Sequence, residues 1–257
     1  MRDIITAKLW QLIEADCAAQ NQPIIWKKPI VRFSDAEDPF FPSLRELIRP
    51  DHHLPQDFLP EARTVISWFI PFLPEIGKSN ITGTTPSPEW ADAYNITNAM
   101  AARVNLQLCD WFRKCQDQDA AVPSDAGMLG EHHEIPWSLW SQRHVAVHAG
   151  IGTFGINNML ITDEGCVGRC FSIVTTMKIP PDLPLAEERC LYKRNGSCGI
   201  CIRHCPAGAL TKDGFDRYAC MEQLNQNKAA GAAATVCGKC LVGLPCSFTN
   251  PTKTTKE

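Results

Sequence analysis

The sequence predicts an α+β protein with a larger N-terminal lobe and a smaller cysteine-rich C-terminal module. Residues 63–70 are rich in β-branched and aromatic side chains and end at Pro71, which is typical of a buried strand. Residues 89–116 carry apolar side chains at helical spacing. Eight of the 13 cysteines lie between positions 190 and 246. The first two features predict a mixed lobe, and the third predicts a module organised by its thiols.

The N-terminal part alternates helical and extended patterns. Residues 3–18 have apolar side chains at roughly helical spacing, which predicts an amphipathic helix, and residues 29–33 resemble a short strand. Ser43 with Glu46 three residues later is a helix-start signal, so we expect a helix over residues 43–48. His52 lies in the connection that follows, and we expect it at the surface.

The second half of the lobe contains shorter elements. We expect a strand near residues 120–123, a helix over 136–149 and strands within 157–162 and 166–176. The proline-rich residues 179–184 predict a boundary. The expected division is therefore a lobe of residues 1–184, a cysteine module of residues 185–250, with short helices at 207–210 and 216–226, and a polar tail of residues 251–257.

Composition excludes some classes of protein. The 257 residues are 44% hydrophobic and 21% charged, as in ordinary globular proteins. The longest apolar runs are far shorter than the ~20 residues that a spanning helix needs, so we expect no membrane segment and a cytoplasmic location. The formal net charge of −3 argues against a general nucleic-acid-binding surface.

The C-terminal cysteines have the spacing of iron–sulfur ligands. Cys198, Cys201 and Cys205-Pro206 match the last three cysteines of the bacterial ferredoxin run, in which the cysteine before proline ligates the neighbouring cluster. Cys190 lies eight residues before Cys198 rather than three, and a longer loop can bring it to the same cluster. The spacing predicts iron–sulfur ligation.

A second set of cysteines completes two groups of four. If the ligands cross over as in two-cluster ferredoxins, the groups are Cys190, Cys198, Cys201 and Cys246 for one cluster and Cys205, Cys220, Cys237 and Cys240 for the other. Two structural zinc sites are an alternative for the Cys-x-x-Cys pairs. Disulfides are a weaker one, because no secretory signal is recognisable and thiols inside cells stay reduced.

Residues 150–155 read G-x-G-x-x-G without being a dinucleotide fingerprint. A Rossmann site needs a strand before the glycines and a helix after them, and here the predicted order is reversed. Two interpretations remain. The glycines allow the backbone to approach a bulky ligand closely, or they form the turn that ends the preceding helix.

Residues 141–162, together with the cysteine module, resemble the epoxyqueuosine reductase family and its short iron–sulfur relatives, a group related to the reductive dehalogenases. The resemblance implies a nitroreductase-like α/β lobe that holds cobalamin beside a ferredoxin-like module with two [4Fe-4S] clusters. It also implies that the loop against the corrin ring consists of Ala149, Gly150, Gly152 and Gly155, with Asn157 beside it.

The chain departs from that family at the catalytic aspartate. The family places this aspartate thirteen residues before the Ala-Gly-x-Gly loop, where this chain has Pro136, and Glu134 is the nearest carboxylate. Glu134 is therefore the candidate catalytic residue. This departure, the lack after Cys246 of the repeat-containing extension of typical members, and the negative net charge predict that tRNA is not a partner.

The resemblance predicts an oxidoreductase that passes electrons through two clusters to cobalamin for reduction of a small-molecule or corrinoid ligand. An external low-potential donor of the ferredoxin or flavodoxin type would supply the electrons. One alternative is an electron-transfer or corrinoid-handling protein without turnover of its own. Another replaces cobalamin with flavin.

Overall fold

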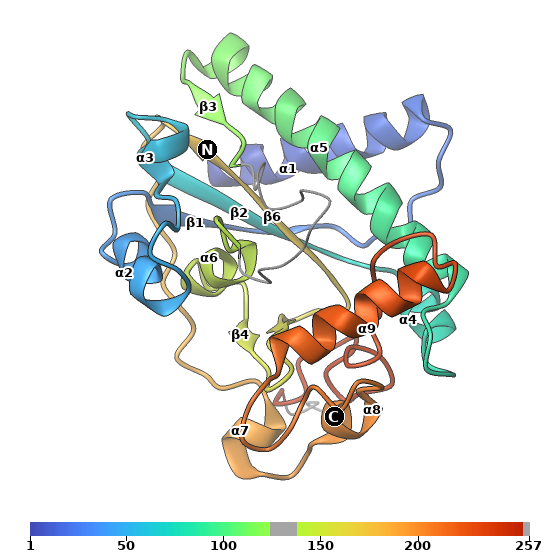
Figure 1. Ribbon diagram of the computed structural model, residues 1–257. Helices are drawn as coiled ribbons and strands as arrows, with labels where there is room; N and C mark the ends of the chain where they lie inside the picture. Colours follow the sequence, from blue (N-terminus) through green and yellow to red (C-terminus); the bar gives the residue numbers. More distant parts are fainter. Residues whose placement is uncertain (124–137, 254–257) are drawn as a thin grey trace.

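The computed structural model describes residues 1–123 and 138–253 (Figure 1). The helices in these ranges are α1 (Arg2–Ala19), α2 (Phe40–Leu47), α3 (Pro55–Phe58), α4 (Pro74–Ser79), α5 (Pro88–Gln116), α6 (Gln142–His148), α7 (Leu191–Asn195), α8 (Ile200–His204) and α9 (Arg217–Ala229). The strands are β1 (Ile30–Asp35), β2 (Thr64–Pro71), β3 (Ala120–Ala121), β4 (Thr153–Phe154), β5 (Leu160–Ile161) and β6 (Gly168–Thr175).

The lobe is organised around an antiparallel sheet of strand order β1-β2-β6-β3. The register pairs Phe33 with Ile66 and Ile66 with Ile173, so apolar side chains of three strands align on one face. β4 and β5 form a separate two-stranded sheet. The strands expected near residues 29–33, 63–70, 120–123 and 166–176 are all present.

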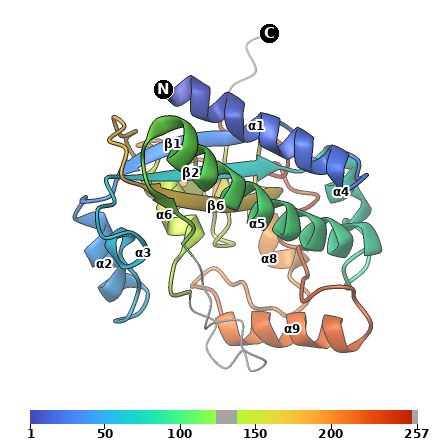
Figure 2. The same ribbon diagram turned by 90° about the horizontal axis from the view of Figure 1, so that it is seen from above.

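Strand β2 is buried along its whole length, which places it at the centre of the lobe. Ile66, Trp68 and Ile70 pack with α1 and α5, whereas Val65 faces a second cluster around Trp140. A strand covered on both faces reads as a continuous apolar run rather than an alternating one. Figure 2 shows the two layers, with α1 and α5 on one side of the sheet and α6 on the other.

Two sequence-based expectations are wrong in their detail. The helix expected at Ser43 begins at Phe40, because the side chain of Asp38 accepts the Phe40 N–H at 2.8 Å and starts the helix one turn earlier. Ser43 instead donates its hydroxyl to Phe40 O at 2.7 Å. The described part of the helix expected over residues 136–149 is shorter, since α6 begins only at Gln142.

His52 is buried rather than at the surface. Its side chain is 0% exposed, and its Nε2 accepts the Ser141 N–H at 3.0 Å. The ring lies 6.0 Å from that of Trp140. The connection that the sequence predicts at the surface therefore contributes to the core beside α6. There the His52 imidazole accepts a hydrogen bond from a buried backbone N–H.

The cysteine-rich segment packs directly against the lobe. Backbone N–H groups of Cys166 and Val167 donate to Cys246 O at 2.9 Å and Ser247 O at 3.1 Å, which joins the start of β6 to the end of the chain. In Figure 1, α7, α8 and α9 gather at one end of the lobe, with α7 and α8 below β4 and with α9 beside α4. The short helix expected at residues 207–210 is absent, and Leu210 instead pairs with Phe215 in an isolated bridge. Among the described residues, no helix is both long and apolar enough to cross a membrane.

Candidate functional site

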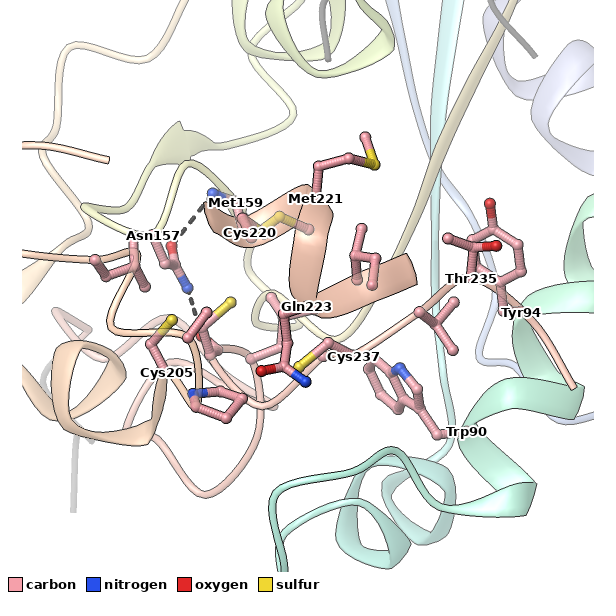
Figure 3. Close-up of a pocket in the computed structure, with 18 of the residues that line it drawn as sticks. Trp90, Tyr94, Asn157, Met159, Cys205, Cys220, Met221, Gln223, Thr235 and Cys237 are labelled. Carbon is pink, nitrogen blue, oxygen red and sulfur yellow. Dashed lines mark hydrogen bonds between the residues drawn. The ribbon is translucent and has the colours of Figure 1, made fainter. Parts of the chain in front are cut away.

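A cavity of about 340 Å³ lies between the lobe and α9, and we call it the large cavity. Its walls include four of the predicted ligands, namely Cys205, Cys220, Cys237 and Cys240. In the view of Figure 3, Cys205 and Cys220 lie toward one end and the rings of Trp90 and Tyr94 toward the other. The cavity therefore has a thiol end and an aromatic end.

Local backbone features present these four thiols. Cys205 follows the last residue of α8, and Cys220 lies in the first turns of α9, whose N-cap Asp216 accepts the N–H groups of Tyr218 and Ala219 at 3.0 Å. Cys237 and Cys240 flank Gly238, which has a φ of +75°. That left-handed turn suits glycine and lets both sulfurs face the same space.

The other four predicted ligands line a second, smaller cavity, which we call the small cavity. Its walls include Cys190, Cys198, Cys201 and Cys246. Cys190 is the N-cap residue of α7, and this short helix fills the longer interval before Cys198. Gly199, with a φ of +137°, then turns the chain between Cys198 and Cys201. The thiols predicted for the two clusters thus lie around two separate cavities.

Asn157 lies between the two cavities and lines both. Its Nδ2 donates to Cys240 O at 2.7 Å, and its Oδ1 accepts the Met159 N–H at 3.2 Å. Both bonds are drawn in Figure 3. The side chain therefore ties the β4–β5 turn of the lobe to the loop that carries Cys240.

Burial dominates the electrostatics of the thiols. It raises the pKa of Cys220 to about 11 and that of Cys201 to about 12, and the neighbouring cysteines add to the effect. Within residues 1–123 and 138–253, no three His, Cys, Asp or Glu side chains are placed to hold a single metal ion. A cubane differs from a single ion because each thiolate binds a separate iron at its own corner.

The donor set fits iron–sulfur clusters. Each cavity offers four cysteine sulfurs, which is the ligand number of a [4Fe-4S] cluster. Apolar side chains, including Leu210 and Leu244, pack around the cysteines of both groups. Such surroundings limit access of water to a bound cluster.

Cys166 is a site residue that the sequence did not reveal. The side chain is 1% exposed, and its thiol donates to Leu241 O at 3.6 Å. A side-chain interaction with Cys166 also lowers the pKa of Cys246. The spacing of Cys166 from Cys170 indicated a turn and a strand without ligands. No local signal could have found this contact, because 80 residues separate the two cysteines.

The predicted corrin-contacting residues are mostly engaged with their own chain. A Cβ on Gly150 would lie 2.3 Å from Leu183 O, and one on Gly152 would lie 2.4 Å from Ile161 O. Ala149 is 0% exposed. Gly155 lines the small cavity, and its missing Cβ leaves room for the side chain of Asn157. Close backbone packing thus accounts for glycine at positions 150 and 152. Glu134, the candidate catalytic residue, lies outside the described residues.

Comparisons with known proteins agree with the resemblance that the residues indicate. No family model matches the chain. The chain is 28% identical over 184 residues to the epoxyqueuosine reductase of Bacillus subtilis (strain 168). The matched residues cover 68% of this chain and 42% of that protein. The chain is similar to epoxyqueuosine reductases. This confirms the resemblance noted in the sequence, although the chain spans less than half the length of this curated relative.

Solved structures of two kinds share the mixed α+β fold. An epoxyqueuosine reductase with an epoxyqueuosine-modified tRNA stem loop matches with a TM-score of 0.56 at 18% identity, over 93% of this chain and 66% of that one. A reductive dehalogenase whose structure suggests a mechanism for B12-dependent dehalogenation matches with a TM-score of 0.57 at 15% identity, over 87% of this chain and 30% of that one.

One expectation about partners is wrong. We did not expect tRNA as a partner, yet a neighbour with the same fold is solved with a tRNA stem loop, and curated relatives are named epoxyqueuosine reductase. The net charge of −3 misled the prediction, because a formal total does not describe the potential at one face of a protein.

Proposed function

We propose that this chain is an iron–sulfur reductase. In this proposal the four cysteines of the small cavity hold one [4Fe-4S] cluster and the four cysteines of the large cavity hold a second. The observation that carries the proposal is the sorting of eight cysteines, spread over 57 residues of sequence from 190 to 246, into two groups of four around two cavities. When bound, such clusters supply single-electron transfer.

The chain's own residues would position and tune these clusters. Asn157 holds the loop of Cys240 against the lobe, which fixes the position of the two cavities relative to each other. The large cavity continues from its thiols to Trp90 and Tyr94, so a molecule bound at the aromatic end would lie beside the second cluster. Electrons would enter from an external ferredoxin-type or flavodoxin-type donor and reach that molecule through the cluster.

Metal analysis of ligand variants tests the two groups. After anaerobic purification, we expect about eight irons and eight sulfides per chain, as two [4Fe-4S] clusters require. Cys201→Ser and Cys220→Ser should each lower the iron content to about half, because each removes a ligand of a different cluster. Cys115→Ser, at an exposed cysteine, and Cys109→Ser, at a buried one on α5, are the controls and should retain full iron.

Zinc in place of iron in the purified protein would refute the proposal. So would full iron content in both ligand variants.

The further parts of the proposal rest on resemblance. We assign residues 1–184 to a nitroreductase-like lobe, residues 185–250 to a ferredoxin-like module and residues 251–257 to a tail. Glu134 would be the proton donor, so Glu134→Gln should lose turnover and keep both clusters. An epoxyqueuosine-modified tRNA stem loop is one substrate to assay, because a structural neighbour is solved with it.

Cobalamin is the least supported part of the reductase proposal. A relative of the same fold is B12-dependent. However, the volume of about 340 Å³ is at the low end for a site that binds a drug-sized ligand, and a corrinoid is much larger. The described residues therefore do not show a fit. Titration of the anaerobic protein with cobalamin, followed by its visible spectrum, tests the group directly, and flavin analysis tests the other candidate.

A further inference from the structure

Three arginines line the large cavity. Arg143 comes from α6, Arg169 from β6 and Arg217 from the first turn of α9. The three come from distant parts of the sequence, and each of the other two guanidinium groups lowers the pKa of Arg143. Positive charge is thus concentrated where the lobe meets α9.

Arg143 and Arg169 have no carboxylate partner among the described residues. Arg143 donates to Asn158 O at 2.7 Å and to Met159 Sδ at 3.1 Å. Arg169 lies over the ring of Tyr94, with its Cζ 4.2 Å from the ring centroid. Its Nε is buried and has no hydrogen-bond partner within the described ranges. Cations that are largely buried are ordinarily paired, and within the described residues neither guanidinium group has a carboxylate to pair with.

The described walls of the large cavity contain no Asp or Glu. Their other side chains are chiefly apolar or aromatic, and Gln223 and Thr235 add a few polar atoms. Burial lowers the pKa of both Arg143 and Arg169, which indicates the cost of leaving these charges without compensation. An anionic group in the cavity would offset that cost, and an apolar body attached to it would contact Trp90 and Tyr94.

We propose that the large cavity binds a small organic molecule that carries a carboxylate or phosphate group, held by Arg143 and Arg169. A guanidinium presents a planar fork of N–H donors that matches both anions. The rings of Trp90 and Tyr94 in the same cavity accommodate the rest of the molecule. The anion-binding site is inferred from the arginines alone. Only its role as the site of reduction rests on the function proposed above.

A pair of probes that differ in charge alone tests the site. Phenylacetate and its neutral amide, phenylacetamide, have nearly the same shape, so their difference reports the anion. Isothermal titration of the anaerobically purified protein should show saturable binding of phenylacetate at least tenfold tighter than that of phenylacetamide. Inorganic phosphate should compete with phenylacetate, because both anions bind the same guanidinium groups.

Variants identify the residues responsible. Arg169→Gln should weaken phenylacetate binding at least tenfold, whereas Arg169→Lys, which keeps the charge, should retain part of it. Arg143→Gln should weaken it as well. Arg113→Gln is the matched control, since Arg113 is an exposed α5 residue that pairs with Asp110, and it should bind as the unmodified protein does.

Equal binding of acid and amide would overturn the inference, as would unaltered binding in both Arg169→Gln and Arg143→Gln. If these variants shift a cluster potential while phenylacetate does not bind, the arginines only balance the charge of the cluster, and the inference is also wrong. Iron content is measured on each sample. If the protein contains no iron and still binds phenylacetate through Arg169, the cluster proposal is refuted and the anion site is supported.

Discussion

At the scale of single residues, Cys166 shows how a side chain outside a motif can act on the site. Its buried thiol donates to Leu241 O at 3.6 Å and is a side-chain partner of Cys246, one of the proposed ligands, to which it can donate once Cys246 is a thiolate. Its backbone N–H also donates to Cys246 O at 2.9 Å, which fixes the relative position of the two residues. Hydrogen bonds to ligand sulfur stabilise the more negative, reduced state of a cluster and so raise its reduction potential.

Removal of this bond gives a prediction about potential. Cys166→Ala should make the reduction potential of the small-cavity cluster more negative and shift that of the other cluster less, because Cys166 interacts more strongly with Cys246 than with Cys240. Cys166→Ser keeps a donor and should give a smaller shift. Redox titration followed by electron paramagnetic resonance measures both clusters, with Cys109→Ala as the control. Unshifted potentials in a fully loaded Cys166→Ala protein would remove the tuning role.

His144, which precedes Val145 on α6, gives the stability of the protein a dependence on pH. Burial, together with the positive charge of Arg143, lowers its pKa to about 4 from an ordinary 6.5. Its Nδ1 lies 2.7 Å from Ser141 Oγ. In the folded state this imidazole is neutral at neutral pH. The unfolded chain takes up a proton near pH 6.5, whereas the folded chain does so only near pH 4.

The sign of the effect follows from proton linkage. Above pH 6.5 the contribution of His144 to stability is complete, and it falls as the pH drops from 6.5 toward 4 because the unfolded state binds the proton first. The maximal slope is about 1.4 kcal/mol per pH unit. His144→Gln should therefore lose less stability between pH 7.5 and 5.5 than the unmodified protein in anaerobic urea unfolding. An equal loss in both proteins would contradict the assignment.

At the scale of elements, α1 and α5 are held together by a partly buried ion pair. Arg103 on α5 donates through Nε and Nη2 to the two carboxylate oxygens of Asp16 on α1, at 2.7 and 2.8 Å. The Asp16 side chain is only 2% exposed, whereas that of Arg103 is 35% exposed. The bidentate geometry fixes the register of the two helices over the sheet.

Truncation of Arg103 tests this packing. Arg103→Ala leaves the Asp16 carboxylate buried without its partner, so we expect a loss of about 2 to 3 kcal/mol in the free energy of unfolding, below that of a fully buried pair because water reaches Arg103. Lys114→Ala, which breaks an exposed pair with Asp110 on the same helix, should cost less than about 1 kcal/mol. Chemical denaturation compares the two, and similar losses would contradict the argument.

At the scale of the whole molecule, the cysteine-rich segment is locked onto the lobe near the junction of α4 and α5. Lys239 is 3% exposed and donates from Nζ to Asn80 O at 2.9 Å and Thr82 O at 2.7 Å. The side chain of Asn80 in turn donates to Cys237 O at 2.9 Å. The lobe therefore contributes directly to the position of the loop that carries two proposed ligands.

Gly238 tests that connection. A Cβ at this position would lie 2.3 Å from the ring of Trp90, and the φ of +75° is itself unfavourable for other residues. Gly238→Ala should lower both the melting temperature and the iron content. The control is Gly83→Ala, because Gly83 has a φ of +72° and nothing within 4 Å, so it carries the backbone cost of about 1–2 kcal/mol without the clash. A Gly238→Ala protein that behaves like Gly83→Ala would show that the contact with Trp90 is dispensable.

The sequence by itself determined the local features of this protein. The apolar run of β2 and the periodicity of α5 indicated their elements, because contacts within a strand or a helix depend on neighbouring residues. The spacing of Cys198, Cys201 and Cys205 likewise indicated a ligand loop, since the reach of a tight turn is fixed by a few bonds. Ser43 misled the prediction because the side chain of Asp38 supplies an earlier start.

Only the tertiary structure decided which distant residues meet. The contact of Cys166 with Cys246, the burial of His52 and the convergence of Arg143, Arg169 and Arg217 join segments that are far apart in the chain. Sequence spacing carries no information about such pairs, because sheet pairing and the packing of apolar faces bring them together. The cationic cavity exists because α6, β6 and α9 meet there, and no one of these segments predicts it.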